Sequence, residues 1–180
     1  MIPVEYLWGV LIFVFAMIGL VRGLWKEMGT ATILLLSLAA LNLGQTLVLD
    51  KLLSGSDGGG LGNLSAEAVV AIYYGATIMF VAFISYQGVV LEFPVKKQTG
   101  VVKWFFGFLG GLANGYLIVG TVWDVLSQAD YFDQIDVSSL SQLHQTITRY
   151  LPVTLMNSND FVPYLVLAFG VIMLLAIILK

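Results

Sequence analysis

Two long stretches without charge, separated by only six residues, constrain this fold more than any other feature of the sequence. Residues 6–21 and 28–49 contain no Asp, Glu, Lys or Arg. A single helix over residues 6–49 would extend about 66 Å, which is twice the ~30 Å thickness of a bilayer's hydrocarbon core. The chain must therefore reverse direction in the short segment between the two stretches, and both stretches are expected to be membrane helices.

That short segment carries three charges, Arg22, Lys26 and Glu27. A charge near the centre of a bilayer costs about 2.5–3.5 kcal/mol on insertion scales, so the charges predict a cytoplasmic elbow at the membrane surface. Gly23 and Gly29 are the predicted break points, because glycine holds a helix poorly. Two interpretations of the charges stay open: they are snorkelling anchors that fix topology, or they make an ionic contact with lipid or a partner.

The composition supports a membrane protein. The 180 residues are 59% hydrophobic and 11% charged, with a mean hydropathy of +0.93, whereas roughly a quarter of the residues of a soluble domain are charged. The formal net charge of −3 argues against nucleic acid as a partner, because no basic stripe is present to neutralise phosphates. No cysteine occurs, which excludes disulfides and thiol chemistry.

Five apolar stretches approach the length that a membrane helix needs. We therefore predict an all-α integral membrane bundle of about five transmembrane helices, forming one domain over residues 1–180. A segment with apolar residues at helical spacing predicts an additional short amphipathic helix on the outer surface, at about 137–151. The predicted spans are about 6–21, 28–49, 68–91, 104–123 and 161–179.

The distribution of basic residues predicts the orientation. Cytoplasmic segments are enriched in Lys and Arg, and an N-terminus outside the cell places six of the eight basic residues in the cytoplasm. Five spans then return the C-terminus to the cytoplasm. The inner residues are Arg22, Lys26, Lys96, Lys97, Lys103 and Lys180, and the outer residues are Lys51 and Arg149.

The fourth predicted span carries a glycine pattern typical of close helix packing. Gly107, Gly111 and Gly115 are spaced four residues apart, and Gly110 and Asn114 form a second row beside them. Small residues at this spacing let helix backbones approach closely in lipid. The pattern predicts contact with another helix, either in the same chain or in a partner. Asn114 is expected to form a hydrogen bond across that contact, with a substrate pathway as the alternative role.

Nothing in the sequence predicts catalysis. No ionisable residue lies in the middle of a predicted span, which argues against a proton relay. His144 is the single histidine and has only glutamines close by, so no metal site is expected. A Gly-x-Ser-x-Gly motif is absent. We therefore predict a protein that is not an enzyme, with no catalytic residue, cofactor or metal ion.

Two segments resemble the colicin V production protein (CvpA) family of bacterial inner-membrane proteins. The first, "GLVRGLWKEMGTATILLL", has an apolar run followed by Arg-Gly and then Glu. The second, "TGVVKWFFGFLGGLANGYLIVG", has Thr-Gly ahead of a glycine-rich span. The family tends to carry an Asp-Arg pair where this chain has Lys103 and Trp104, and a basic residue where this chain has Asn114.

The resemblance implies a location in the bacterial plasma membrane and a non-enzymatic role in export or envelope processes. Two other classes of function stay open. The chain is an accessory or scaffold subunit of a larger, energy-transducing membrane complex, or it is a small channel or transporter component. The expected partners are the lipid bilayer and either other membrane-protein subunits or a second copy of the chain.

Overall fold

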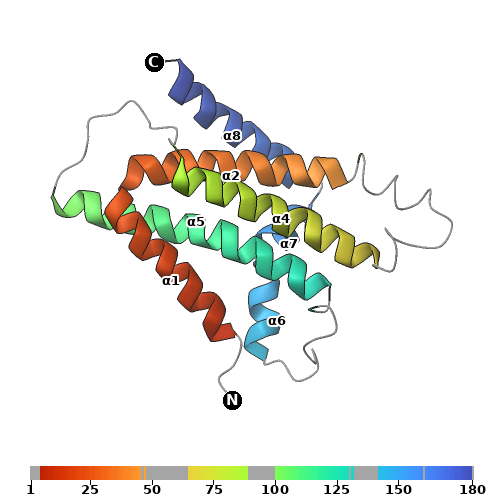
Figure 1. Ribbon diagram of the computed structural model, residues 1–180. Coiled ribbons are helices and arrows are strands. Elements are labelled where there is room, and N and C mark those ends of the chain that lie inside the picture. The colour runs from red at the N-terminus through yellow and green to blue at the C-terminus, as the bar shows by residue number, and fades with distance from the viewer. Residues whose placement is uncertain are drawn as a thin grey trace.

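The computed structural model describes residues 5–45, 47, 65–88, 100–129, 131, 142–159 and 161–179. Within these ranges, all regular secondary structure is helical (Figure 1). Four long helices pack side by side, the last helix runs along one of them, and two short helices lie near one end. The helices are α1 (Glu5–Arg22), α2 (Leu24–Gly44), α4 (Ala66–Gln87), α5 (Val101–Gln128), α6 (Gln142–Thr148), α7 (Pro152–Asn157) and α8 (Val162–Ile178).

Gly23 alone separates α1 from α2. Its φ of 83° lies in the left-handed region that favours glycine, and its N–H still donates to the Gly19 carbonyl at 2.8 Å. The predicted start of the second helix, residue 28, is wrong by four residues. One residue with positive φ is enough to turn the chain, so Lys26 and Glu27 belong to the first turns of α2. The prediction that Gly29 is a second break point is wrong, because Gly29 is buried inside α2 and the helix continues through it.

Helices α1 and α5 run in opposite directions, whereas α2 and α5 run in the same direction, since the start of α2 lies against Gly110 and Asn114. Gly107 of α5 contacts Gly19 near the end of α1, whereas Gly115 contacts Ile12 nearer its beginning, so α1 and α5 are antiparallel. On the other side of the bundle, Leu36 of α2 contacts Gly170 of α8. Figure 1 shows α8 lying along the outside of α2 and α1 crossing α5.

Three of the helices in the described part of the chain are long and apolar enough to cross a membrane. They are α2, α4 from Glu67, and α5. Helices α1 and α8 are also apolar but shorter. The all-α class is therefore confirmed, and these three helices are consistent with the predicted membrane character. They do not establish the predicted number of about five spans.

The apolar core lies between α2, α4 and α5 and is closed at one end by α7. Tyr74 and Ile78 of α4 are fully buried, and Leu34 of α2 lies beside them. In a bilayer such side chains contribute chiefly through van der Waals packing, because lipid tails are as apolar as the core. The other buried members of this core are Leu38, Ala39, Leu41, Ala71, Ala82, Ile118, Val125, Val153 and Met156.

Two predicted boundaries differ from the structure. Helix α5 extends from Val101 to Gln128, beyond the predicted 104–123, and Asp124 just past the predicted end is accommodated because it is buried with hydrogen-bond partners on α7. The amphipathic helix predicted over 137–151 is the seven-residue α6 in the described chain. Residues 137–141 lie outside the described residues, and Leu151 is the N-cap residue of a further helix, α7, which the sequence did not predict.

Asp124 fixes the start of α7. Its Oδ2 accepts a hydrogen bond from the Thr154 N–H at 2.7 Å, and its Oδ1 accepts from the Thr154 hydroxyl and from Gln128 Nε2, each at 2.8 Å. The N-cap residue, Leu151, has no side-chain acceptor of its own. The carboxylate therefore does for α7 what a capping side chain usually does within one helix, and it sits at the positive end of the helix dipole.

Replacing Asp124 with alanine is expected to lower the free energy of unfolding by about 1–2 kcal/mol, the usual cost of losing a helix cap. Asp124→Asn keeps one acceptor oxygen and is expected to lose less. Unfolding of the purified protein in mixed micelles, followed by circular dichroism, measures both. Equal stability of the alanine variant and the unmodified chain would contradict the capping role.

Candidate functional site

A buried carboxylate lies at the junction of four helices. Glu27 of α2 is 0% exposed. Its Oε1 accepts a hydrogen bond from Arg22 Nη1 at 2.9 Å, and its Oε2 accepts from the Tyr86 hydroxyl at 2.9 Å and from Asn114 Nδ2 at 2.7 Å. Asn114 Nδ2 also donates to the Glu27 backbone carbonyl at 2.8 Å. We name Arg22, Glu27, Tyr86 and Asn114 the elbow cluster.

Arg22 neutralises this carboxylate and is itself almost enclosed. The two side chains form an ion pair in which Arg22 is 14% exposed. Its Nη2 donates to the Ser85 backbone carbonyl at 2.9 Å, and its guanidinium carbon lies 4.2 Å from the centre of the Tyr86 ring. Arg22 Nη1 also reaches the Thr30 hydroxyl at 3.4 Å. A planar guanidinium with several donors suits such a site, because it can pair with a carboxylate and stack on an aromatic ring together.

The elbow charges therefore differ from both sequence interpretations. Arg22 and Glu27 pair with each other inside the chain rather than snorkelling to a surface or reaching a partner. Lys26 is exposed, as an anchor would be. Glu27 and Asp124 lie near the ends of α2 and α5 rather than in the middle of a predicted span, but both are enclosed, at 0% and 1% exposure. Both carboxylates are enclosed because each has several hydrogen-bond donors nearby.

The two small-residue rows on α5 serve two different neighbours. Gly107, Gly111 and Gly115 form the face on which α1 lies, and a Cβ atom at Gly111 would come within 2.9 Å of the Gly19 Cα. Gly110 belongs to the second row, where a Cβ atom would lie 2.8 Å from the Glu27 Cβ. The first row thus lets α1 approach closely, and the second makes room for the glutamate beside Asn114.

Two polar atoms at this site have no hydrogen-bond partner among the described residues. They are Asn114 Oδ1 and Ser85 Oγ, both buried. A buried polar atom without a partner costs roughly 1–3 kcal/mol. No group of three or more metal-ligating side chains occurs in the described ranges.

Sequence reasoning placed Arg22, Gly23, Lys26 and Glu27 at one turn and Asn114 on another helix, but it did not bring the two sets together. Tyr86 was missed altogether, since a tyrosine near the end of an apolar stretch usually marks only the membrane interface. The available signal was the spacing of Gly110 and Asn114, which leaves a notch wide enough for a second polar side chain.

Lys103, where the resembled family tends to be acidic, lies close to the turn. Its Cε is 3.2 Å from the position that a Cβ atom would occupy at Gly23, so the lysine stem covers the exposed side of the break between α1 and α2. Trp104 beside it is exposed at 55%.

Comparison of this chain with protein-family models, with curated proteins and with solved structures finds no match.

Proposed function

We propose that this chain is a multi-pass protein of the bacterial plasma membrane that supports export or envelope processes without catalysing a reaction, as its resemblance to the CvpA family implies. The observation that carries the proposal is the elbow cluster. Its charges and hydrogen bonds join α1, α2, α4 and α5 to one another. Interactions directed inward in this way favour a rigid scaffold over a site that binds and releases a substrate.

A scaffold needs a surface for its partners, and the glycine face of α5 is already covered by α1. The outer faces of α4 and α8 remain. In α8 only Pro163 and Gly170 are buried, and in α4 Phe80 and Phe83 are each 65% exposed. Apolar faces of this kind meet either lipid or helices of other subunits. An accessory role in a larger membrane complex is therefore a specific form of the same proposal.

Loss of the gene tests the proposed role. We expect a deletion strain to become more sensitive to detergents and to antibiotics that the envelope excludes, and the unmodified chain to restore resistance. An Arg22→Met variant is expected to restore it poorly, because the scaffold is destabilised. A deletion strain with an unchanged envelope would contradict the proposal.

Extraction in mild detergent distinguishes the accessory form of the proposal from the independent form. A stoichiometric partner supports the accessory role, and a lone chain or homo-oligomer supports an independent role.

We also propose five crossings, with the N-terminus outside and the C-terminus in the cytoplasm. The alternating directions of the long helices and the bias of basic residues support this topology. Cysteines introduced at Lys26 and Ser158, both exposed, provide the test, because the chain has no cysteine of its own. We expect an impermeant thiol reagent added to intact cells to label Ser158→Cys and to leave Lys26→Cys unlabelled. Labelling of both would exclude the topology.

One observation favours a second candidate, a small transporter component. Ionisable residues inside membrane proteins often lie on ion pathways, and Asn114, which bonds Glu27, has an Oδ1 atom without a partner in the described chain. Such a role predicts proton flux in proteoliposomes that is abolished by Glu27→Gln and reduced by Asn114→Leu. A proton flux equal to that of empty liposomes would contradict the transporter role and leave the scaffold role as the proposal.

A further inference from the structure

Positive charge collects at the end of the bundle that holds the turn between α1 and α2. Figure 1 shows the start of α5 at this same end, and Lys103, the third residue of α5, lies against the turn. Lys26 is the third residue of α2 and is exposed. Because Glu27 is enclosed and paired with Arg22, the excess positive charge among the described residues at this end belongs to the two lysines.

The stem of Lys103 is held at the turn because Gly23 has no side chain. A Cβ atom at Gly23 would lie 3.2 Å from Lys103 Cε and 3.7 Å from its Cγ, so a larger residue would displace the lysine. In the described part of the chain, no carboxylate lies within ion-pair distance of Lys103. The lysine is therefore partly fixed before it meets an anion, which reduces the side-chain entropy lost on binding.

Exposed apolar side chains flank the lysines. Val21 at the end of α1 is 74% exposed, and Val101 and Trp104 in the first turn of α5 are 83% and 55% exposed. Tryptophan near the end of a membrane helix usually lies at the level of the lipid headgroups. A ligand that suits this surface therefore combines a negative charge with apolar chains. A soluble anion would pair with the lysines but leave the apolar side chains uncovered.

We propose that the turn between α1 and α2 binds an anionic phospholipid, whose phosphate group pairs with Lys103 and Lys26 and whose acyl chains lie against Val21 and Trp104. The lysines come from two helices, so the lipid bridges α2 and α5 at the membrane surface. Each lysine near an anionic membrane surface strengthens binding about fivefold. The inference rests on the proposed insertion of the chain in a membrane, and the proposed topology places this lipid in the cytoplasmic leaflet.

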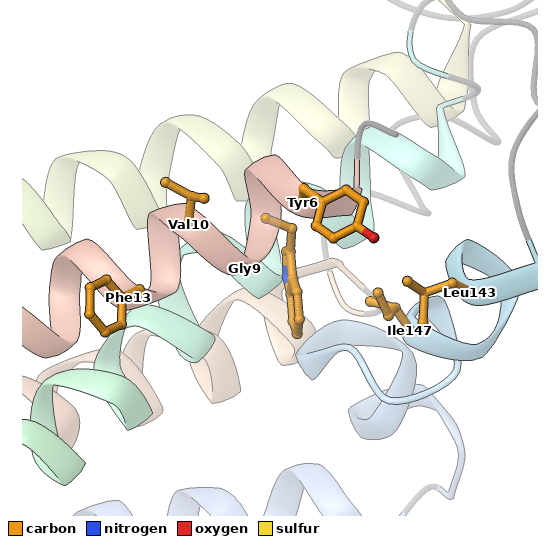
Figure 2. Close-up of a pocket in the computed structure, with 7 residues that line it drawn as sticks. Tyr6, Gly9, Val10, Phe13, Leu143 and Ile147 are labelled. Carbon is orange, nitrogen blue, oxygen red and sulfur yellow. The ribbon is translucent and has the colours of Figure 1, made fainter. Parts of the chain in front are cut away.

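The first half of α1, away from the turn, has no feature that selects a headgroup. Figure 2 shows an apolar groove there, with Leu143 and Ile147 extending from α6 toward the first turns of α1. A lipid chain in this groove would not distinguish anionic from neutral headgroups, because no charged side chain occurs among the described residues that line it. A preference for anionic lipid therefore reports the lysines and not the groove. The lining residues are Tyr6, Trp8, Gly9, Val10, Phe13, Leu143 and Ile147.

Native mass spectrometry of the full chain tests this proposal. The protein in mild detergent is mixed with equal amounts of palmitoyl-oleoyl phosphatidylglycerol and palmitoyl-oleoyl phosphatidylcholine, which share their acyl chains, and the bound lipids are counted. We expect the unmodified chain to prefer the anionic phosphatidylglycerol and Lys103→Gln to reduce this preference about fivefold. Lys26→Gln is expected to reduce it as well, whereas Lys103→Arg keeps the charge and most of the preference.

Arg149→Gln is the matched control, because it removes one positive charge from an exposed residue beside α6, far from the turn (Figure 1). It is expected to leave the preference unchanged. An equal loss in Arg149→Gln and Lys103→Gln would overturn the proposal, since overall charge would then attract the lipid. An unmodified chain without preference, or release of the phosphatidylglycerol by inorganic phosphate, would also overturn it. Carbonate extraction reports membrane insertion separately, so failure of the lipid site is distinguishable from failure of the membrane assignment.

Discussion

Replacing Arg22 with methionine is expected to lower the free energy of unfolding by about 3–5 kcal/mol, the cost of breaking a buried ion pair on one side only. Methionine keeps much of the arginine's apolar length but leaves the Glu27 carboxylate at 0% exposure without its counter-ion. The hydrogen bonds from Tyr86 and Asn114 remain, but neither carries a positive charge. Unfolding in mixed micelles, followed by circular dichroism, measures the loss.

Two further variants decide whether the buried charge causes this effect. Arg22→Met combined with Glu27→Gln removes both charges and keeps an acceptor for Tyr86, so we expect it to recover a large part of the lost stability. Lys26→Met removes an exposed charge from the same turn and is expected to change the free energy of unfolding by no more than about 0.5 kcal/mol. A double variant that is less stable than Arg22→Met would show that the ion pair is not the cause.

Adding a single methyl group at Gly111 is expected to destabilise the protein by about 1–3 kcal/mol, the usual cost of overpacking. The Cβ atom of Gly111→Ala would lie 2.9 Å from the Gly19 Cα and 3.0 Å from the Gly19 nitrogen, and it would also press on the Phe15 carbonyl oxygen. These are backbone atoms, which cannot move aside by changing rotamer. Helix α1 must therefore separate from α5, and the same unfolding measurement reports the effect.

The control for Gly111→Ala is the same substitution at Gly75. A Cβ atom there meets nothing within 4 Å, so only the helix propensity changes, and Gly75→Ala is expected to be neutral or to stabilise the helix by up to about 1 kcal/mol. Opposite signs at the two positions identify the α1–α5 contact as the source of the loss. If both variants were destabilised equally, the glycine face would have no packing role.

The helical class and the approximate positions of the long helices were predictable, because length and hydrophobicity are local properties of the sequence. The turn between α1 and α2 was also predictable, since no single helix of residues 6–49 fits a bilayer. The residue at which α2 starts was not predictable, because the charges at Lys26 and Glu27 were expected to keep this segment out of a membrane helix. In the structure Glu27 is compatible with α2 because it finds donors on other helices.

The elbow cluster could be predicted only in part. The pattern of Gly110 and Asn114 indicated close packing on one face of α5, but nothing in the sequence indicated that Glu27 is the residue beside them. That pairing depends on how α2 rotates about its axis, and the rotation depends on many weak apolar contacts at once. Asp124 and Thr154 illustrate the same limit. Their hydrogen bonds join residues thirty positions apart, and a chain reversal between them sets the geometry.

The elbow cluster also sets the order in which its contacts can form while the chain is being synthesised. Arg22 and Glu27 are five residues apart and meet as soon as the first hairpin leaves the ribosome, whereas Tyr86 and Asn114 are synthesised 59 and 87 residues after Glu27. Until then the Glu27 carboxylate can pair only with Arg22. Translation must therefore proceed past residue 114 before all the hydrogen bonds to Glu27 can form.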